Sequence, residues 1–166
     1  MSKDPNELLF VGLDLATVAG MAMISEDLKS CWVYELKGNP YEQFFQIQNI
    51  ICNQPAVWGI EELHIFRNAK TVRSLAERSG FIKWMLKGVL KEKVMMVQVS
   101  KARKYIGAKN KEQARELMQC LVVNGGTLTD NHSDAILVAQ MVAREVLKID
   151  DMNQAIVPSV HIGILT

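Results

Sequence analysis

The segment from Leu8 to Ile24, LLFVGLDLATVAGMAMI, restricts the possible folds more than any other part of the sequence. Its first six residues form a continuous apolar run, which is typical of a strand buried on both faces of a sheet. Asp14 follows this run, small residues lead through a turn to Gly20, and a second apolar run ends at Ile24. The segment therefore predicts two buried strands joined by a short turn.

Asp14 is the only charged residue between Glu7 and Glu26. A carboxylate at the end of a buried strand is costly unless hydrogen-bond donors or cations meet it. It could cap the turn by bonding the nearby backbone, as Asp side chains often do. Alternatively, it belongs to a polar site assembled from distant parts of the chain, and the remaining sequence favours this second interpretation.

Strands and helices alternate along the rest of the chain. Hydrophobic patterning predicts strands over residues 8–13, in the run that ends at residue 24, and over residues 31–36, 56–60 and 94–99. Helices are predicted from Pro40, with Asn39 as the N-cap, and over residues 68–90, 111–123 and 131–147, the last with Thr129 as its N-cap. Residues 100–109 are predicted to be a basic connecting segment.

The connections between these elements determine how the strands pair. Short turns join the first three strands, which should be antiparallel, whereas crossover helices make the later strands parallel. The expected result is an α/β fold with a mixed five-stranded sheet flanked by helices. Residues 150–166 form a tail in which VPSVHIGIL could either pair as an edge strand or pack over a partner subunit.

Length and composition predict one soluble domain over residues 1–166. A chain of 166 residues that is 49% hydrophobic and 22% charged can bury a full core. No apolar run approaches the roughly 20 residues of a membrane span, and the first residues do not resemble a signal peptide. Three cysteines without ligand-like spacing indicate reduced thiols, so the expected location is the cytoplasm: Cys31, Cys52 and Cys120.

The charges are distributed unevenly, although the formal net charge is only +1. Thirteen Lys and Arg residues stand against two acids between Arg67 and Lys111, and the rest of the chain is acidic. A basic tract of this kind indicates a polyanionic partner. A solvated helix face or a membrane surface would explain the same composition, so the charge pattern alone leaves all three possibilities open.

Three acidic residues are expected to converge at one edge of the sheet. Asp14 ends the first strand, Glu61 follows the fourth, and Asp134 lies near the start of the last helix. If the first and fourth strands are parallel neighbours, both strand-end acids emerge at the carboxyl edge, where open α/β sheets bind ligands. Carboxylates in contact repel one another, and Mg²⁺ or Mn²⁺ would resolve the conflict and support phosphodiester hydrolysis by a two-metal mechanism.

Four segments carry a resemblance to a known family. VGLDLATVAGMAMI, VWGIEELHIF, YIGAKNKEQARE and LTDNHSDAILVA, in this order, resemble the RuvC-type Holliday junction resolvases of the ribonuclease H-like superfamily. The resemblance extends from about Leu8 to Ala143 and rests on order and spacing, since no single motif is very specific. It implies a sheet with strand order 3-2-1-4-5, in which strand 2 is antiparallel.

The same resemblance implies an activity and its site. The expected protein is a Mg²⁺-dependent endonuclease, with Mn²⁺ able to substitute, that cuts opposed strands of a four-way DNA junction as a homodimer. It would be encoded by a bacterium or a phage. Asp14, Glu61 and Asp134 match the metal ligands of the family, and Glu61 fits better than Glu62 because of its distance from Asn68-Ala69.

The fourth metal ligand of the family is where this sequence departs from the pattern. Asn131 occupies the position at which the family usually has Asp or His. Asp130 is the favoured replacement because residues four apart share one helix face, here with Asp134. His132 or the amide oxygen of Asn131 remain alternatives.

Basic residues also acquire roles from the resemblance. Lys111 matches a lysine that contacts phosphate near the scissile bond and could offset charge in the transition state, and Lys104 is a looser match for a second one. Phosphate contacts of this kind give affinity with little sequence specificity. The residues expected to bind DNA are Arg67, Lys70, Arg73, Lys104, Lys109 and Lys111.

Two further features concern the substrate and the partner. His64 or Phe66 could wedge against unstacked bases at a branch point, although Phe66 could equally be a core residue. The helix predicted over residues 68–90 has more apolar area than one sheet face needs, so it is the expected dimer interface. Two other functions remain open: an RNA-processing relative, and an inactive nucleic-acid-binding relative suggested by Asn131.

Overall fold

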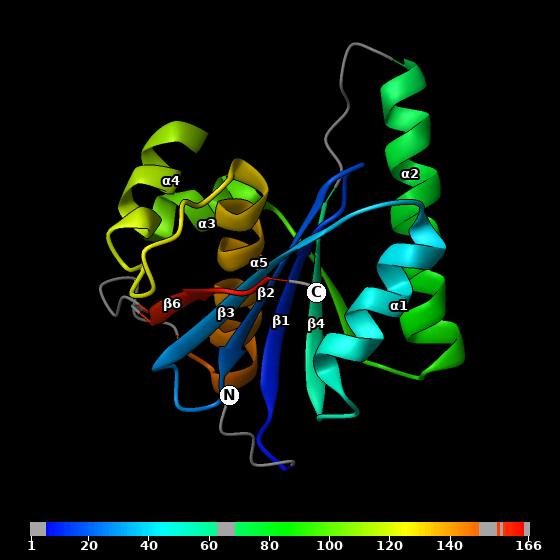
Figure 1. The fold of residues 1–166 in the computed structure, drawn as a ribbon, viewed down its shortest axis with the longest axis horizontal. Helices are drawn as coiled ribbons and strands as arrows, with labels where there is room; N and C mark the ends of the chain where they lie inside the picture. The colour runs from blue at the N-terminus through cyan, green and yellow to red at the C-terminus, as the bar shows by residue number, and fades with distance from the viewer. Residues whose placement is uncertain (1–5, 63–68, 150–155, 157, 165–166) are drawn as a thin grey trace.

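The computed structural model describes residues 6–62, 69–149, 156 and 158–164, with only the backbone of residues 69 and 70. The described part of the chain forms a six-stranded sheet with helices on both faces (Figure 1). Its strands are β1 (Leu9–Asp14), β2 (Ala19–Ser25), β3 (Ser30–Leu36), β4 (Ala56–Glu61), β5 (Val94–Val97) and β6 (Ser159–Ile162). Its helices are α1 (Pro40–Ile51), α2 (Ala69–Trp84), the π-helical turn η1 (Met85–Val89), α3 (Val99–Tyr105), α4 (Lys111–Gln119) and α5 (Asp130–Leu147).

The strand order is β5-β4-β1-β2-β3-β6, which contains the predicted order 3-2-1-4-5. As predicted, β2 is antiparallel to both β1 and β3, and β4 is parallel to β1 and β5. The prediction of five strands is wrong by one, because the tail adds β6 parallel to β3. Part of the tail therefore forms an edge strand, which was one of the two predicted alternatives. In this strand Val160 pairs with Cys31 of β3.

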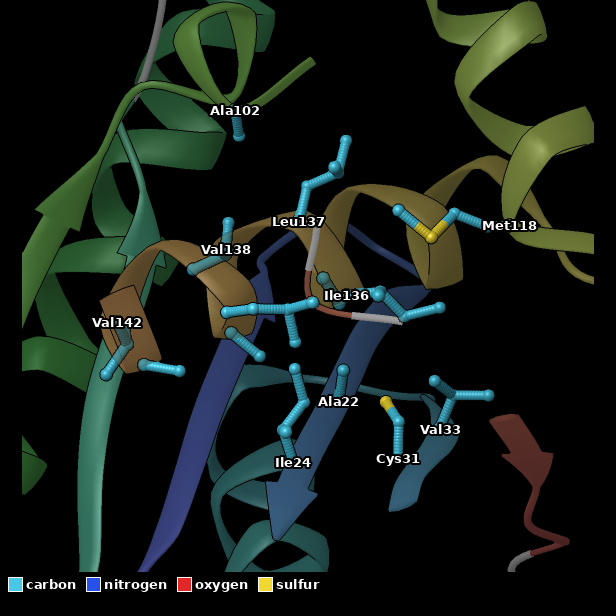
Figure 2. Packing of buried hydrophobic residues seen from close by; sticks show 14 of the residues in the cluster. Ala22, Ile24, Cys31, Val33, Ala102, Met118, Ile136, Leu137, Val138 and Val142 are labelled. Atoms are coloured by element: carbon cyan, nitrogen blue, oxygen red, sulfur yellow. The ribbon is translucent and has the colours of Figure 1, made fainter. Parts of the chain in front are cut away.

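One face of the sheet is covered by α5, with α3 and α4 beside its first half (Figure 1). Ala22 and Ile24 of β2 face α5 in a fully buried cluster (Figure 2). The helix backbone approaches the sheet closely, because a Cβ on Gly12 would lie 2.1 Å from the carbonyl oxygen of Ala135. A Cβ on Gly20 would lie equally close to the carbonyl oxygen of Asn131. Glycine at these two strand positions thus sets how near α5 lies to β1 and β2.

The other face carries α1 and α2, on the opposite side of the sheet from α5 (Figure 1). A second buried cluster fills this layer and contains Leu13, Ile47 and Ile82. The predicted start of α1 is confirmed: Asn39 is the N-cap, and Glu42 completes a capping box. None of the helices that the structure describes is long and apolar enough to span a membrane.

Four elements differ from the sequence prediction in extent or type. The helix predicted over residues 68–90 is α2 followed by the π-helical turn η1. The strand predicted over residues 94–99 ends at Val97, because Gln98 is already the N-cap of the next helix. This helix, α3, lies where a connecting segment was predicted. Only Val99 and Ala102 of α3 are buried, which is too short a pattern to indicate a helix. The helix predicted over residues 111–123 ends at Gln119.

Candidate active site

The carboxyl edge of the two central parallel strands presents the first two acids. Leu13 of β1 pairs with Ile60 of β4, so Asp14 and Glu61 occupy the next position on neighbouring strands. Asp134 comes from α5, whose N-cap is Thr129 as predicted. The close approach of α5 to β1 at Gly12 brings this first part of the helix over the strand ends.

The predicted convergence of the three acids is present in the structure. One carboxylate oxygen from each of Asp14, Glu61 and Asp134 lies within 4.8 Å of the other two. Asp134 is 1% exposed and Asp14 7% exposed, while Glu61 is half-buried. The acids line a pocket of about 320 Å³ whose other described walls are Leu15, Ala16, Glu62, Leu75, Arg103, Lys111 and Asn131.

Burial and mutual repulsion change the protonation of the cluster. Burial is the largest cause that raises the pKa of Asp14 to about 8, followed by the charge of Glu61, a hydrogen bond with Glu61 and the charge of Asp134. Burial also raises the pKa of Glu61. Without a cation, Asp14 is therefore largely protonated near neutral pH and shares its proton with Glu61.

Two basic side chains form ion pairs with Asp134, the third acid. The Arg103 Nη2 atom donates to Asp134 Oδ1 at 2.8 Å, and Lys111 Nζ lies 2.8 Å from Asp134 Oδ2. Burial opposes the charge of Lys111, but its hydrogen bond and ion pair with Asp134 and the nearby Asp14 and Asp130 raise its pKa. Lys111 therefore stays protonated in the pocket.

Sequence reasoning missed Arg103 and selected its neighbour Lys104 instead. Arg103 is four residues after the buried Val99, on the side of α3 that packs toward α5, whereas Lys104 is exposed. Helical spacing from Val99 would have identified Arg103, but no helix was predicted here.

The predicted fourth ligand does not join the cluster. Asp130 is paired with Arg115, whose Nη1 atom donates to Asp130 Oδ1 at 2.9 Å, and its side chain is 45% exposed. His132 belongs to the capping box of α5, in which its Nδ1 atom accepts a hydrogen bond from the backbone N–H of Thr129. Of the three alternatives, Asn131 alone lines the acidic pocket, and its amide donates to the carbonyl oxygen of Val18.

The other residues expected to bind DNA fall in three groups. Arg67, together with the candidate wedge residues His64 and Phe66, lies outside the described residues. Lys70 is in α2, where only its backbone is described, and Arg73 on α2 is exposed and paired with Glu77 at 2.9 Å. The structure brings the rest to the active-site side of the molecule: Lys111 in the acidic pocket, and Lys104 and Lys109 in an adjoining hollow with Arg103.

The donor set fits a hard divalent cation. Three carboxylates supply oxygen atoms at mutual distances that one or two small ions can bridge. No Cys or His belongs to this cluster among the described residues, so the site does not resemble a zinc centre. Burial and the charges of Glu61 and Asp134 keep a proton on Asp14 near neutral pH, and a bound cation would take the place of this proton.

Comparisons with known proteins agree with this architecture. No family model and no curated protein sequence matches the chain. Its fold is similar to that of Thermus thermophilus RuvC in complex with a Holliday junction substrate, with a TM-score of 0.61 and 11% identity over 87% of this chain and 96% of RuvC. A second Thermus thermophilus RuvC structure gives a TM-score of 0.58 and 12% identity over 86% and 95% of the two chains. The chain therefore has the fold of the RuvC Holliday junction resolvases, the family that its sequence motifs resemble.

Proposed function

We propose that this protein is a divalent-metal-dependent endonuclease that hydrolyses phosphodiester bonds in branched DNA, with the four-way junction as its substrate. The observation that carries the proposal is the convergence of Asp14, Glu61 and Asp134 at the carboxyl edge of a RuvC-like sheet. The basic residues around this edge supply the complementary charge for DNA, and one similar structure is RuvC with a Holliday junction substrate.

Mg²⁺, or Mn²⁺ in its place, is the cation that we propose for the acidic pocket. Asp14, Glu61 and Asp134 would hold it, and it would supply a water of lowered pKa and stabilise charge on the phosphate and the leaving oxygen. Loading the site requires the shared proton of Asp14 and Glu61 to leave.

Lys111 and Arg103 contribute charge of their own to the reaction. Both point at Asp134 inside the pocket and are therefore beside any phosphate bound over the three acids. Because the pKa of Lys111 is raised, its ammonium remains charged and stabilises the negative charge that develops on the phosphate. Asp134 contacts both of these side chains and is also a proposed ligand of the metal.

A cleavage assay on three labelled substrates tests the proposal. With Mg²⁺ or Mn²⁺, the protein should nick a synthetic four-way junction at symmetrical positions in two opposed strands and leave a linear duplex of the same sequence intact. EDTA should stop the reaction. Faster cleavage of structured RNA would identify an RNA-processing enzyme instead, and junction binding without cleavage in either metal would identify an inactive binding protein.

Asp130 provides a test of the predicted fourth ligand. Since its carboxylate is exposed and paired with Arg115, Asp130→Asn should change the cleavage rate by less than about fivefold, as an exposed ion pair contributes little. Asp134→Asn is the matched variant on the same helix and should lose cleavage. A loss of more than about 100-fold in Asp130→Asn would instead mean that this side chain leaves Arg115 to bind metal.

A homodimer is the proposed assembly, because two opposed strands of a junction require two active sites. The outer surface of α1 and α2 carries aromatic side chains that could form it. Tyr41 is 64% exposed and Trp84 60% exposed, and the ring centroids of Tyr41 and Phe81 are 4.4 Å apart. Exposed aromatic clusters of this kind mark protein interfaces.

Trp84→Glu should convert the dimer to a monomer, because a carboxylate would be buried without a partner at the centre of the interface. Size-exclusion chromatography with light scattering measures the mass. Leu117→Glu on α4, where Leu117 is 44% exposed, is the control and should remain dimeric. A monomeric wild type, or an unchanged mass in Trp84→Glu, contradicts this interface.

A further inference from the structure

Arg103 lies between two neighbouring pockets of opposite charge. On one side it lines the acidic pocket and donates to Asp134. On the other it lines a wide hollow of about 560 Å³ with Lys104 and Lys109. Among the described residues no carboxylate lines this hollow, whose remaining described walls are Ser100, Gly107 and Ala108. A ligand bound in one pocket can therefore affect the other pocket through the side chain of Arg103.

The basic hollow has the chemistry of a phosphate site. Lys104 and Lys109 are exposed, and within the described part of the chain neither ammonium has a hydrogen-bond or ion-pair partner. The Nε atom of Arg103 is buried and also lacks an acceptor there. A buried donor without a partner is unfavourable, and a phosphate oxygen is an acceptor that a guanidinium binds with two parallel hydrogen bonds.

Arg103 and a divalent cation would compete for the carboxylate of Asp134. Asp134 is 1% exposed, and its two oxygens are taken by Arg103 and Lys111. A divalent cation bound to Asp134 would repel the guanidinium and compete for Oδ1. The Arg103 side chain is 20% exposed, and the hollow beside it is open, so the displaced guanidinium has a place to go.

We propose that the hollow formed by Arg103, Lys104 and Lys109 binds a backbone phosphate of the substrate strand, and that Arg103 moves from Asp134 to this phosphate when a divalent cation occupies the acidic pocket. The inference rests on the proposed nuclease function and adds a coupling to it. Metal binding releases Arg103 for DNA, and DNA binding removes a competitor of the metal. The two ligands therefore bind cooperatively.

Calorimetric titration of Mn²⁺ without DNA tests the first half of the coupling. Arg103→Gln should bind Mn²⁺ about tenfold more tightly than the wild type, because a charge-assisted hydrogen bond no longer competes for Asp134. Lys101→Gln, an exposed neighbour on α3, is the control and should bind Mn²⁺ as the wild type does. Unchanged or weaker Mn²⁺ binding by Arg103→Gln overturns the exchange.

Junction binding tests the second half, measured with Ca²⁺ under conditions in which no product forms. Adding Ca²⁺ should raise the junction affinity of the wild type more than that of Arg103→Gln. The double variant Lys104→Gln/Lys109→Gln should bind the junction more weakly with unaltered Mn²⁺ affinity, and an unchanged junction affinity contradicts the phosphate site. If neither the wild type nor Arg103→Gln binds Mn²⁺, the metal site and the proposed function fail together.

A readout on the wild type avoids dependence on folding of the variants. The side-chain Nε–H resonance of Arg103 in a ¹⁵N-labelled sample, assigned by comparison with Arg103→Lys, should shift when Mg²⁺ is added. It should shift again with a non-cleaved junction. A resonance that is insensitive to Mg²⁺, in a protein shown to bind Mn²⁺, means that Arg103 stays on Asp134 and overturns the inference while leaving the metal site intact.

Discussion

Replacing Asp14 with Asn should abolish DNA cleavage and stabilise the metal-free protein at the same time. Loss of a residue that only supports a metal ligand typically costs 10- to 100-fold in activity, so loss of a ligand itself should cost more than about 100-fold. The gain in stability arises because three acids lie within 4.8 Å of one another in a buried pocket, so Asp14 must take up a proton on folding near neutral pH, whereas Asn is neutral without one. Junction cleavage and thermal unfolding in EDTA measure the two effects.

The dependence of this stability on pH has a definite sign. The pKa of Asp14 rises from 3.8 to about 8 in the folded protein, so the folded state retains a proton that the unfolded state releases above pH 4. Wherever the native state binds more protons, stability falls as pH rises, here between about pH 4 and pH 8. The pKa of Glu61 is raised as well and contributes in the same direction.

Unfolding in EDTA should therefore show a falling free energy of unfolding across this pH window for the wild type and a flatter curve for Asp14→Asn. Saturating Mg²⁺ should remove most of the difference, because a bound cation stabilises the charged form of the wild-type site. Asp27→Asn is a control for a carboxylate outside the site. Full cleavage activity in Asp14→Asn, or a wild-type protein whose stability rises with pH, would contradict the proposed metal centre.

Gly12→Ala should be among the most destabilising single conservative changes to the central strands. The added Cβ would lie 2.1 Å from the carbonyl oxygen of Ala135 and 2.4 Å from the backbone nitrogen of Ala139. Both contacts are with the backbone of α5, so no side-chain rotation can relieve them, and the helix has to move away from β1. We expect a loss of about 3 kcal/mol in the free energy of unfolding or failure to fold.

The same substitution should impair the active site, because α5 carries Asp134. If Gly12→Ala folds, its cleavage rate should fall well beyond what its remaining folded fraction explains, since displacement by about 1 Å is enough to disrupt a catalytic site. Gly80→Ala in α2 is the matched control: a Cβ there meets nothing within 4 Å, and Ala has the higher helix propensity. Chemical denaturation of both variants provides the comparison, and equal stability would contradict the close packing of α5.

Local chemistry made much of the fold predictable. The apolar run before Asp14 and the apolar strand before Glu61 identified buried strands, and the turns between the first three strands required antiparallel pairing. The caps Asn39 and Thr129 located the starts of α1 and α5 because their side chains bond the first turn of the helix that follows. Each of these features depends only on residues close together in the chain.

Convergence of the three acids also followed from sequence, through topology. Parallel neighbouring strands end at the same edge of a sheet, so an acid after each strand had to meet the other. Asp134 joins them because the helix that carries it begins at this edge of the sheet. The motif order predicted the RuvC-like fold, although sequence identity to the similar structures is only 11% and 12%.

The tertiary structure alone decided β6, Arg103 and the direction of Asp130. Strand β6 is four residues long and exists through pairing with β3, more than a hundred positions earlier in the chain. Successive helix residues differ by about 100° in direction, so a cluster such as Asp130, Asn131 and His132 points three ways. Which one faces the acids depends on how α5 packs at Gly12 and Gly20. Sequence thus determined which carboxylates end buried strands, whereas packing decided which neighbouring side chains complete the site, because orientation around a helix is set by long-range contacts.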